Sequence, residues 1–153
     1  MKKIFSRSAL ARVLSRRGRK KVVFANGCFD LLHAGHVKLL SLAKSKGDKL
    51  VVALNSDRSV RRLKGAGRPL VPQRERAQVM SALACMDYVT IFDEPTPLET
   101  IRLLKPDVLV KGADYKLSEI VGAGIVGKVA RIPLVKGIST TKLVRKIVKA
   151  YGR

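Results

Sequence analysis

The stretch from Val22 to Leu40 constrains this chain most, because it has the pattern of a strand, a short turn and the start of a helix. An apolar, β-branched run ends at Asn26-Gly27, and helical spacing of apolar residues resumes after Gly35. The free N–H groups and the dipole of a helix start attract anions, and glycines let backbone approach a ligand closely. The layout therefore predicts a phosphate site. The chain's only histidines, His33 and His36, lie three residues apart within it, so both imidazoles can face one anion.

Strand-like and helix-like segments alternate along the chain. We predict strands at 21–25, 49–54, 88–92, 106–115 (its end a polar loop) and 128–132, and helices at 8–17, 35–46, 73–85, 97–104, 118–126 and after Ser139. This alternation is typical of an α/β fold: a single Rossmann-like domain over 1–153, with a five-stranded parallel sheet flanked by helices on both faces. We expect residues 1–20 to form a basic N-terminal helical arm, with its helix packed on the domain.

Three local predictions can be compared directly with a structure. The arginine-rich passage 58–69 contains two glycines and a proline near its end, which favours a loop. The helix at 73–85 is expected to bury Val79, Met80, Leu83 and Ala84. The last helix has Leu143, Val144, Ile147 and Val148 at its apolar positions.

The net charge is +21, and the two ends concentrate it: residues 1–21 hold nine Lys and Arg, and residues 136–153 hold six, without an acid in either stretch. Such charge attracts nucleic acid or anionic lipid. It also fits a solvated surface around a site for phosphate substrates. Aromatic residues make up 5% and do not accompany the bases, so we do not expect nucleic acid as a partner.

Targeting and metal-binding patterns are absent from the sequence. No apolar run is long enough to span a bilayer, so no membrane partner is expected, and the basic N-terminus lacks the apolar stretch of a secretory signal. A cytoplasmic location is the expectation. Cys28 and Cys85 match no metal-ligand spacing and are expected to be reduced thiols, and no metal ligands are predicted.

Three features could hold phosphate: the histidine pair, Lys64, and the helix start at Ser139-Thr140-Thr141. The sequence contains neither G-x-x-x-x-G-K-[ST] nor a G-x-G-x-x-G after its first strand, so it lacks the usual glycine-rich phosphate loops.

The segment Asn26-Gly27-Cys28-Phe29-Asp30-Leu31-Leu32-His33-Ala34-Gly35-His36 resembles the H-x-G-H signature of the nucleotidyltransferase superfamily, which includes the cytidylyltransferases. The resemblance continues through Asn55-Ser56-Asp57, Leu63-Lys64-Gly65, Arg76, residues 110–115 and Gly137-Ile138-Ser139-Thr140-Thr141. As an ordered set, these motifs are most similar to the adenylyltransferase domains of bacterial ADP-heptose synthases. The similarity covers about residues 8–150.

The resemblance implies a role for each matching position. His33, His36 and Lys64 would be catalytic. The nucleotide would contact Asn26, Gly27, Cys28, Phe29, Gly35, His36, Lys111, Gly112, Asp114, Ile138, Ser139, Thr140 and Thr141. The second substrate would contact Asp30, Asn55, Asp57 and Arg76. Many members carry an arginine where this chain has Val144, so Lys142 and Arg145 are alternative triphosphate contacts.

The implied reaction transfers AMP from ATP to a sugar 1-phosphate, with D-glycero-β-D-manno-heptose 1-phosphate as the expected acceptor. Mg²⁺ would enter with the nucleotide, because carboxylates are scarce around the motifs. Further partners compatible with the resemblance are a second copy, as a homodimer, and a sugar kinase acting upstream on a separate chain. Two alternatives stay open: a cytidylyltransferase acting on glycerol 3-phosphate or a related alcohol phosphate, and a non-catalytic, basic nucleic-acid-binding protein.

Overall fold

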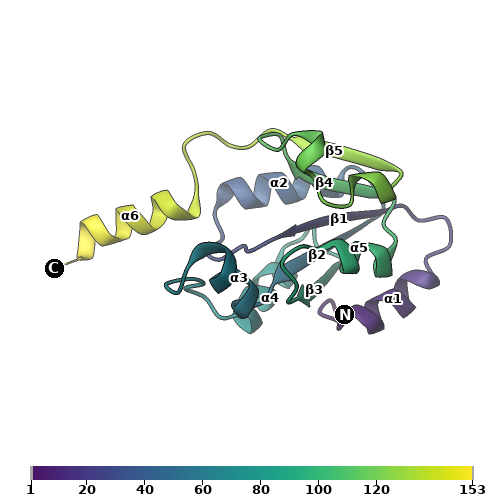
Figure 1. Cartoon of the computed structure of the whole chain (residues 1–153), viewed down its shortest axis with the longest axis horizontal. Helices are drawn as coiled ribbons and strands as arrows, with labels where there is room; N and C mark the ends of the chain where they lie inside the picture. Colours follow the sequence, from purple (N-terminus) through teal and green to yellow (C-terminus); the bar gives the residue numbers. More distant parts are fainter. Residues whose placement is uncertain (1, 153) are drawn as a thin grey trace.

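The computed structural model describes residues 2–152; Met1 and Arg153, the two ends of the predicted domain, lie outside the described residues. Five parallel strands form one sheet in the order β3-β2-β1-β4-β5 (Figure 1). The strands are β1 (Val22–Gly27), β2 (Lys49–Asn55), β3 (Tyr88–Phe92), β4 (Val108–Gly112) and β5 (Lys128–Ile132). The predicted fold class is confirmed, and each predicted strand is present.

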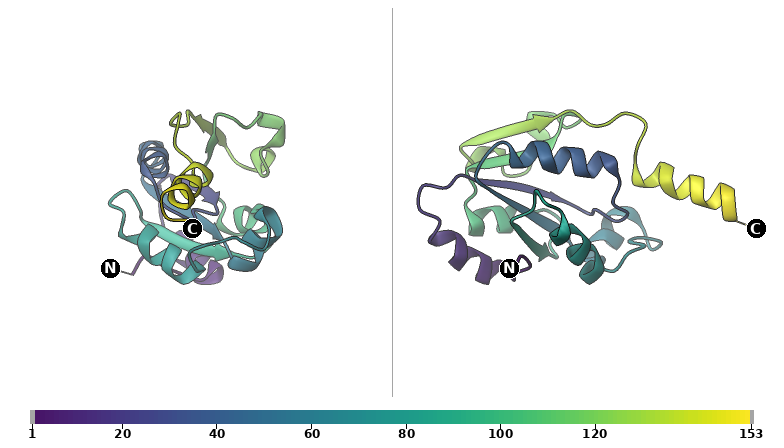
Figure 2. Two further views of the ribbon diagram at one scale, coloured as in Figure 1. Left: turned by 90° about the vertical axis from the view of Figure 1, so that its left-hand side faces the viewer. Right: turned by 180° about the vertical axis from the view of Figure 1, so that it is seen from behind.

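Helices cover both faces of the sheet (Figures 1 and 2). On one face lie α1 (Arg7–Ser15) and α5 (Leu98–Leu104), and on the other lie α2 (Ala34–Lys44) and α4 (Gln73–Ala82). The two remaining helices are α3 (Asp57–Lys64) and α6 (Thr140–Tyr151), and α6 extends away from the sheet. Because side chains alternate along a strand, β1 sends Val23 to the face covered by α2 and α4, and Phe24 to the face covered by α1 and α5. Strands buried on both faces explain the nearly continuous apolar runs in the sequence.

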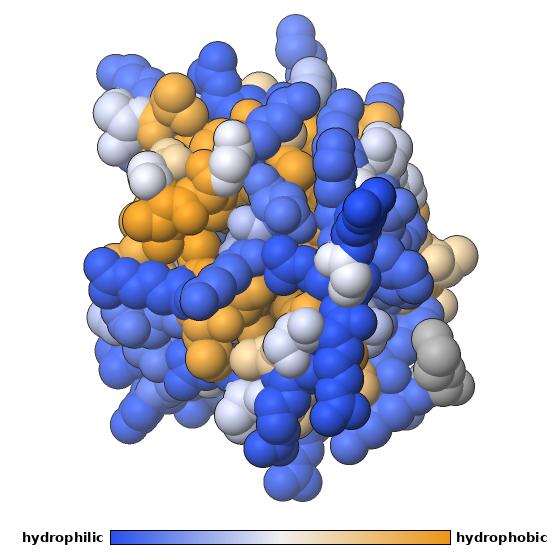
Figure 3. Space-filling view, turned by 90° about the vertical axis from the view of Figure 1, so that its right-hand side faces the viewer, coloured by the Kyte–Doolittle hydropathy of each residue, from blue (hydrophilic) through white to orange (hydrophobic). Residues whose placement is uncertain are grey.

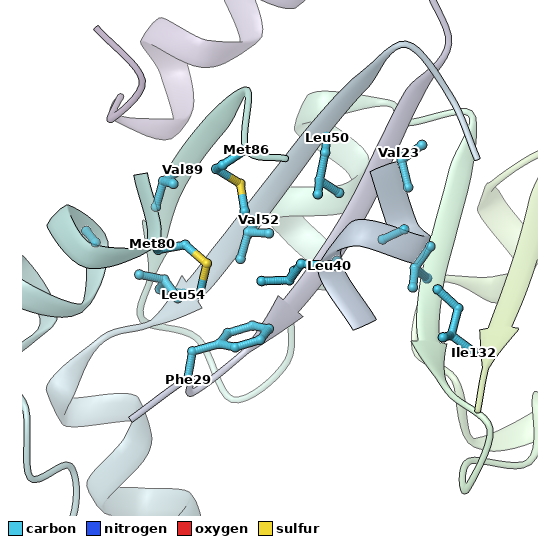
Figure 4. Close-up of a cluster of buried hydrophobic side chains, with 14 of the residues drawn as sticks. Val23, Phe29, Leu40, Leu50, Val52, Leu54, Met80, Met86, Val89 and Ile132 are labelled. Atoms are coloured by element: carbon cyan, nitrogen blue, oxygen red, sulfur yellow. The ribbon is translucent and has the colours of Figure 1, made fainter. Parts of the chain in front are cut away.

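The core on the α2 and α4 face reaches the carboxyl end of β1. Leu40 of α2 and Met80 of α4 pack there with Leu54 of β2, and all three are fully buried (Figure 4). Phe29, which follows β1, forms the end of this cluster. The core therefore supports the turn that carries the sequence motif.

The basic N-terminal segment is integrated into the domain. Leu10 and Leu14 of α1 are buried against the sheet, and Ile4 forms a bridge with Val89 of β3. The packing expected for this helix is present, and the segment is part of a layer of the fold.

Three local predictions are wrong. Residues 57–64 form α3 where a loop was expected, because Ser56 caps the helix by accepting a hydrogen bond from Ser59 N–H at 3.0 Å. The helix expected at 118–126 is two short 3₁₀ turns, η1 (Leu117–Glu119) and η2 (Ala123–Ile125), separated by Gly122 in a left-handed conformation. The helix predicted at 73–85 ends at Ala82, and Val79 and Ala84 are exposed. Met80 shares the buried face of α4 with Arg76 and Ala77.

Carboxylates occupy the end of the sheet where the strands begin. Asp48, Asp87 and Asp107 accept hydrogen bonds from the backbone N–H groups of Lys21, Leu50 and Val22, at 2.7 to 2.9 Å. Figure 3 shows this end of the molecule, where apolar areas lie between bands of hydrophilic side chains. Three of the chain's eleven acids are thus used at the end of the sheet opposite the predicted phosphate site. Within residues 2–152, no helix is long and apolar enough to cross a membrane.

Candidate active site

A cleft of about 710 Å³ opens at the carboxyl ends of the strands. Asn26 of β1, Asn55 of β2 and Lys111 of β4 all line it. The strand order reverses between β1 and β4, since β2 and β3 extend the sheet to one side and β4 and β5 to the other. Ligands of open α/β sheets bind outside the carboxyl ends of the strands at such a reversal. The cleft is therefore where this fold places a ligand.

The two histidines form a stacked pair at the start of α2. Their ring centroids lie 3.7 Å apart with 17° between the ring planes. His33 is the N-cap residue, and its Nδ1 accepts a hydrogen bond from the His36 backbone N–H at 3.4 Å. An accepting Nδ1 leaves the proton of a neutral His33 on Nε2, where it can be donated. Both rings line the cleft, as the spacing predicted.

Burial keeps both imidazoles neutral near pH 7. Burial, and then the neighbouring His33, lower the pKa of His36 to about 4. Burial also lowers the pKa of His33, more than its own backbone hydrogen bond raises it. The pair therefore offers N–H donors to the cleft without placing two positive charges side by side.

Two glycines make room for this arrangement. A Cβ at Gly27 would lie 2.9 Å from the ring of Phe29, and a Cβ at Gly35 would lie 3.1 Å from Cε1 and Nδ1 of His33. Phe29 has a left-handed backbone with a φ of 43°, and its ring meets the His36 ring edge-on, with centroids 5.0 Å apart. The ring of Phe29 thus connects the apolar core to the histidine pair.

Asp30 fastens the loop between α3 and α4 to the cleft. Its carboxylate accepts hydrogen bonds from Arg68 Nη1 at 2.8 Å and from the backbone N–H groups of Leu70 and Val71 at 2.8 and 2.9 Å. Burial alone would raise the pKa of Asp30, but these hydrogen bonds outweigh it and lower the pKa. The carboxylate lines the cleft with its oxygens engaged by the protein, so it positions the loop that follows Lys64.

Arg76 lies beneath the cleft and does not line it. The residue is 2% exposed. Its guanidinium donates to the carbonyls of Val71 at 2.9 Å and Cys28 at 2.5 Å, and to Asp57 Oδ1 at 2.7 Å. Arg76 and Asp57, both expected to contact substrate, pair with each other. They join α3 and α4 to the turn after β1.

Two lysines approach the cleft from different elements. Lys64 is the last residue of α3, immediately before Gly65, and Lys111 lies on β4. Burial lowers the pKa of Lys111, more than the nearby Asp114 and Cys28 raise it. Burial raises the pKa of Cys28, more than the nearby Lys64, Arg76 and Lys111 lower it, so the thiol is protonated near pH 7.

The start of α6 closes one side of the cleft. Ser139 caps the helix by accepting a hydrogen bond from Lys142 N–H at 3.2 Å, and Thr140 Oγ1 donates to the Leu31 carbonyl at 3.5 Å. Ile138 to Thr141 line the cleft, whereas Lys142, Val144 and Arg145 do not. Lys142 and Arg145, the two alternative triphosphate contacts, therefore lie outside the cleft lining.

Most predicted site residues meet in this one cleft. Those that line it are Asn26, Gly27, Cys28, Phe29, Asp30, His33, Gly35, His36, Asn55, Lys64, Lys111, Ile138, Ser139, Thr140 and Thr141. Gly112, Asp114, Asp57 and Arg76 lie outside the lining. Arg68 and Tyr115 line it and were not predicted; Arg68 stands in a Gly- and Pro-rich passage, which was the available signal. Within residues 2–152, no group of three or more His, Cys, Asp or Glu side chains could hold a metal ion.

The fold and the site together define a nucleotidyltransferase of the H-x-G-H type. A model of the cytidylyltransferase-like family matches residues 24–146, and the chain belongs to that family.

The chain is similar to about a third of several longer proteins. It is 57% identical over 148 residues to the bifunctional protein HldE of Campylobacter concisus, a match that covers 97% of this chain and 31% of that protein. It is 58% identical over 137 residues to the HldE protein of Geobacter sulfurreducens, covering 87% and 28%.

Solved structures agree on the fold. The lipopolysaccharide core biosynthesis protein from Thermoplasma volcanium has a TM-score of 0.66 and 31% sequence identity, covering 76% of this chain and 99% of that one. Pantoate-beta-alanine ligase from Francisella tularensis has a TM-score of 0.65 at 16% identity, covering 97% and 78%, and shows the shared fold alone.

Proposed function

We propose that this chain transfers AMP from ATP to a sugar 1-phosphate, with D-glycero-β-D-manno-heptose 1-phosphate as the acceptor. The products are an ADP-sugar and pyrophosphate. The observation that carries the proposal is the stacked pair of His33 and His36 at a helix start, lining a cleft that also contains Lys64 and Lys111. The identity of over half to proteins named HldE supports the choice of acceptor.

The reaction needs alignment and charge stabilisation. An oxygen of the sugar phosphate attacks the α-phosphorus of ATP, and the bond from that phosphorus to the oxygen of the departing pyrophosphate breaks. The attacking phosphate monoester has a second pKa of about 6, so it is already largely ionised at neutral pH. No general base or covalent nucleophile is required, and the chain's task is to hold two anions in line.

Three features of the cleft can stabilise negative charge: the histidine pair, Lys64 and the start of α6. The N–H donors of His33 and His36 would contact the triphosphate as charge develops in the transition state, and Lys64 would bridge the reacting phosphates. The free N–H groups at the start of α6, near Ser139 and Thr140, would hold the outer phosphates. The two carboxylates that line the cleft already accept hydrogen bonds from the protein, Asp30 from Arg68 and the Leu70 N–H, and Glu119 from the Lys116 N–H. Mg²⁺ would therefore be held chiefly by the nucleotide's own phosphate oxygens, where it neutralises charge on the triphosphate.

The acceptor must be made by an enzyme that phosphorylates the sugar. A sugar kinase on a separate chain, or in another part of a longer protein, would supply it. The greater length of the HldE proteins and their description as bifunctional support a second activity in the pathway.

The test is pyrophosphate release by the purified chain with Mg²⁺, using a panel of nucleotides and acceptors. We expect release with ATP and the heptose 1-phosphate, and little release with either substrate alone. A folded protein that releases no pyrophosphate with any pair in the panel would overturn the proposal.

A cytidylyltransferase is the second candidate, favoured by the family's description and by the motif Gly137-Ile138-Ser139-Thr140-Thr141. The same panel separates the two, because this candidate requires CTP with glycerol 3-phosphate or a related alcohol phosphate. Faster turnover with that pair than with ATP and the heptose phosphate would replace the first proposal with the second.

A further inference from the structure

Arg68 is the one arginine among residues 2–152 that lines the cleft. It belongs to the loop between α3 and α4, its side chain is 20% exposed, and no sequence motif gave it a role. Arg76, the arginine expected to contact substrate, lies outside the lining, and its three guanidinium nitrogens already donate to oxygens of the protein. Arg68 therefore supplies the guanidinium that is available to a ligand in the cleft.

A tight turn holds Arg68 four residues after Lys64. The Arg68 backbone N–H donates to the Gly65 carbonyl at 3.1 Å, and the side chains of both cations line the cleft. Gly65 has a positive φ of 96°, and a Cβ on either Gly65 or Gly67 would meet nothing within 4 Å. The two cations thus reach one cleft from a turn that has open space around its glycines.

Asp30 fixes the direction of the Arg68 side chain and leaves most of its donors free. Arg68 Nη1 donates to Asp30 Oδ2 at 2.8 Å, and among residues 2–152 this is the only hydrogen bond of that side chain. The same carboxylate holds the backbone N–H groups of Leu70 and Val71, so the segment after Arg68 is anchored too. A guanidinium has five N–H donors in a rigid fork that matches phosphate oxygens. Its Nε and Nη2 therefore remain for a phosphate ligand.

The strand order distinguishes the two phosphates that the cleft must hold. Lys64 and Arg68 follow β2, whereas the start of α6 follows β5, on the opposite side of β1. In the proposed reaction the start of α6 holds the outer phosphates of ATP. The phosphate on the β2 side is then that of the acceptor. It is a monoester and largely a dianion at neutral pH, which a guanidinium binds with two parallel, charge-assisted hydrogen bonds.

We propose that Arg68 binds the phosphate group of the acceptor through Nε and Nη2, and that Asp30 is the residue that positions it. The identity of the acceptor rests on the proposed function. A phosphate monoester has three terminal oxygens, so two can accept from Arg68 while the third attacks the α-phosphorus beside Lys64. Arg68 thereby selects a phosphorylated acceptor over the free sugar.

Arg68→Gln tests the contact by steady-state pyrophosphate release. We expect the KM for the heptose 1-phosphate to rise at least about tenfold, since a hydrogen bond to a charged group is lost. The KM for ATP should stay within about twofold of the parent. Arg62→Gln is the matched control, because Arg62 also pairs with an aspartate, Asp93, but does not line the cleft. It should leave both KM values unchanged.

Arg68→Lys separates substrate binding from simple fastening of the loop. A lysine can still pair with Asp30, but it cannot bind a phosphate through two parallel hydrogen bonds. We therefore expect an unchanged melting temperature and a KM for the acceptor that stays raised by at least about threefold. If Arg68 only fastened the loop, the lysine variant would restore the KM of the parent.

Binding without turnover separates this proposal from the proposed function. The probes are the heptose 1-phosphate, glycerol 3-phosphate and inorganic phosphate, titrated calorimetrically into the parent and Arg68→Gln with α,β-methylene ATP present. If Arg68→Gln weakens the binding of a probe that the parent binds, and the parent forms no ADP-sugar, the proposed function alone is refuted. A parent that binds no probe would refute both.

Three results in an active parent would overturn the role of Arg68 and leave the proposed function intact. The first is an Arg68→Gln variant with the acceptor KM and dissociation constant of the parent. The second is full restoration of both by Arg68→Lys. The third is a KM for ATP that rises as much as the KM for the acceptor, or rises alone, since the guanidinium would then serve the triphosphate or the loop.

Discussion

His33 and His36 stack with their ring centroids 3.7 Å apart, while Nδ1 of His33 caps the helix that carries His36. One side chain therefore serves both the start of α2 and the cleft. An alanine substitution would therefore remove the imidazole and the helix cap together. Losing an N-cap costs about 1 kcal/mol by itself.

His33→Asn should remove the imidazole and keep the cap, since asparagine is among the best N-cap residues. We expect the free energy of unfolding to stay within about 0.5 kcal/mol and turnover to fall by roughly 10²-fold or more, the usual loss when a preorganised donor is removed. Chemical denaturation and pyrophosphate release measure the two quantities. Unchanged turnover in a folded His33→Asn variant would remove this residue from the catalytic group.

The stability of the chain should fall between about pH 6.5 and pH 4 because of His36. Burial and the adjacent His33 lower its pKa from 6.5 to about 4. In that window the unfolded chain binds more protons than the folded chain, so the free energy of unfolding decreases as the pH falls. The expected contribution is of order 1–3 kcal/mol.

The variant His36→Gln provides the control, since it removes this titration. Denaturation curves collected between pH 4 and pH 7 should show a flatter pH dependence for the variant. The carboxyl groups with lowered pKa values, such as Asp30 and Asp87, titrate below this window in the folded state. Equal slopes for the two proteins would mean that His36 is protonated in the folded chain at pH 5.

Arg76→Met should act mainly on the free energy of unfolding and little on KM for the sugar phosphate. The change leaves Asp57 and the carbonyls of Cys28 and Val71 without their donor, and breaking such a buried pair typically costs about 3 kcal/mol or more. Arg74→Met, on the exposed side of the same helix, is the matched control and should change stability by less than about 0.5 kcal/mol. If Arg76→Met instead raised KM for the sugar phosphate at unchanged stability, the residue would be a substrate ligand after all.

Local patterns were enough to predict the sheet and the phosphate-holding features, whereas most of the other cleft residues followed from the resemblance to nucleotidyltransferases. The apolar runs of β1 and β2 are buried on both faces, so their composition indicates parallel strands directly. The position of His33 and His36 followed from their spacing at a helix start. Residues on different strands, such as Asn26 and Lys111, come together because the carboxyl ends of parallel strands share one edge.

The pairing of charged side chains could not be predicted in the same way. Arg76 takes a buried position of α4 and leaves Val79 exposed, because Asp57 and two backbone carbonyls satisfy its guanidinium across elements distant in sequence. Asp30 likewise has its partners 38 to 41 residues away. For α3, a signal existed in the cap at Ser56, but the glycines and proline that end the segment outweighed it. The spacing of the apolar residues in α6 was predicted, but neither that spacing nor the place of the helix in the chain indicated that this face would stay exposed.

Gly35→Ala should lower activity and leave the free energy of unfolding nearly unchanged, whereas Arg76→Met should act mainly on stability. Alanine is favoured over glycine within a helix by up to about 1 kcal/mol, which offsets the cost of local crowding. The new Cβ would lie 3.1 Å from Cε1 and Nδ1 of His33, so that ring must move by a few tenths of an ångström. The shift would disturb the stacking on His36. We expect a free energy of unfolding within about 1 kcal/mol of the parent and a loss of at least about tenfold in kcat/KM, because small misplacements of catalytic groups are costly.

Gly124→Ala is the control for this prediction, because a Cβ at Gly124 would meet nothing within 4 Å and the residue does not line the cleft. Thermal denaturation and steady-state pyrophosphate release should place this variant beside the parent in both measurements. If Gly35→Ala also kept full activity, the ring of His33 would have an alternative productive position. The contribution of the stacked geometry to catalysis would then be small, and the cleft would depend mainly on Lys64, Lys111 and the start of α6.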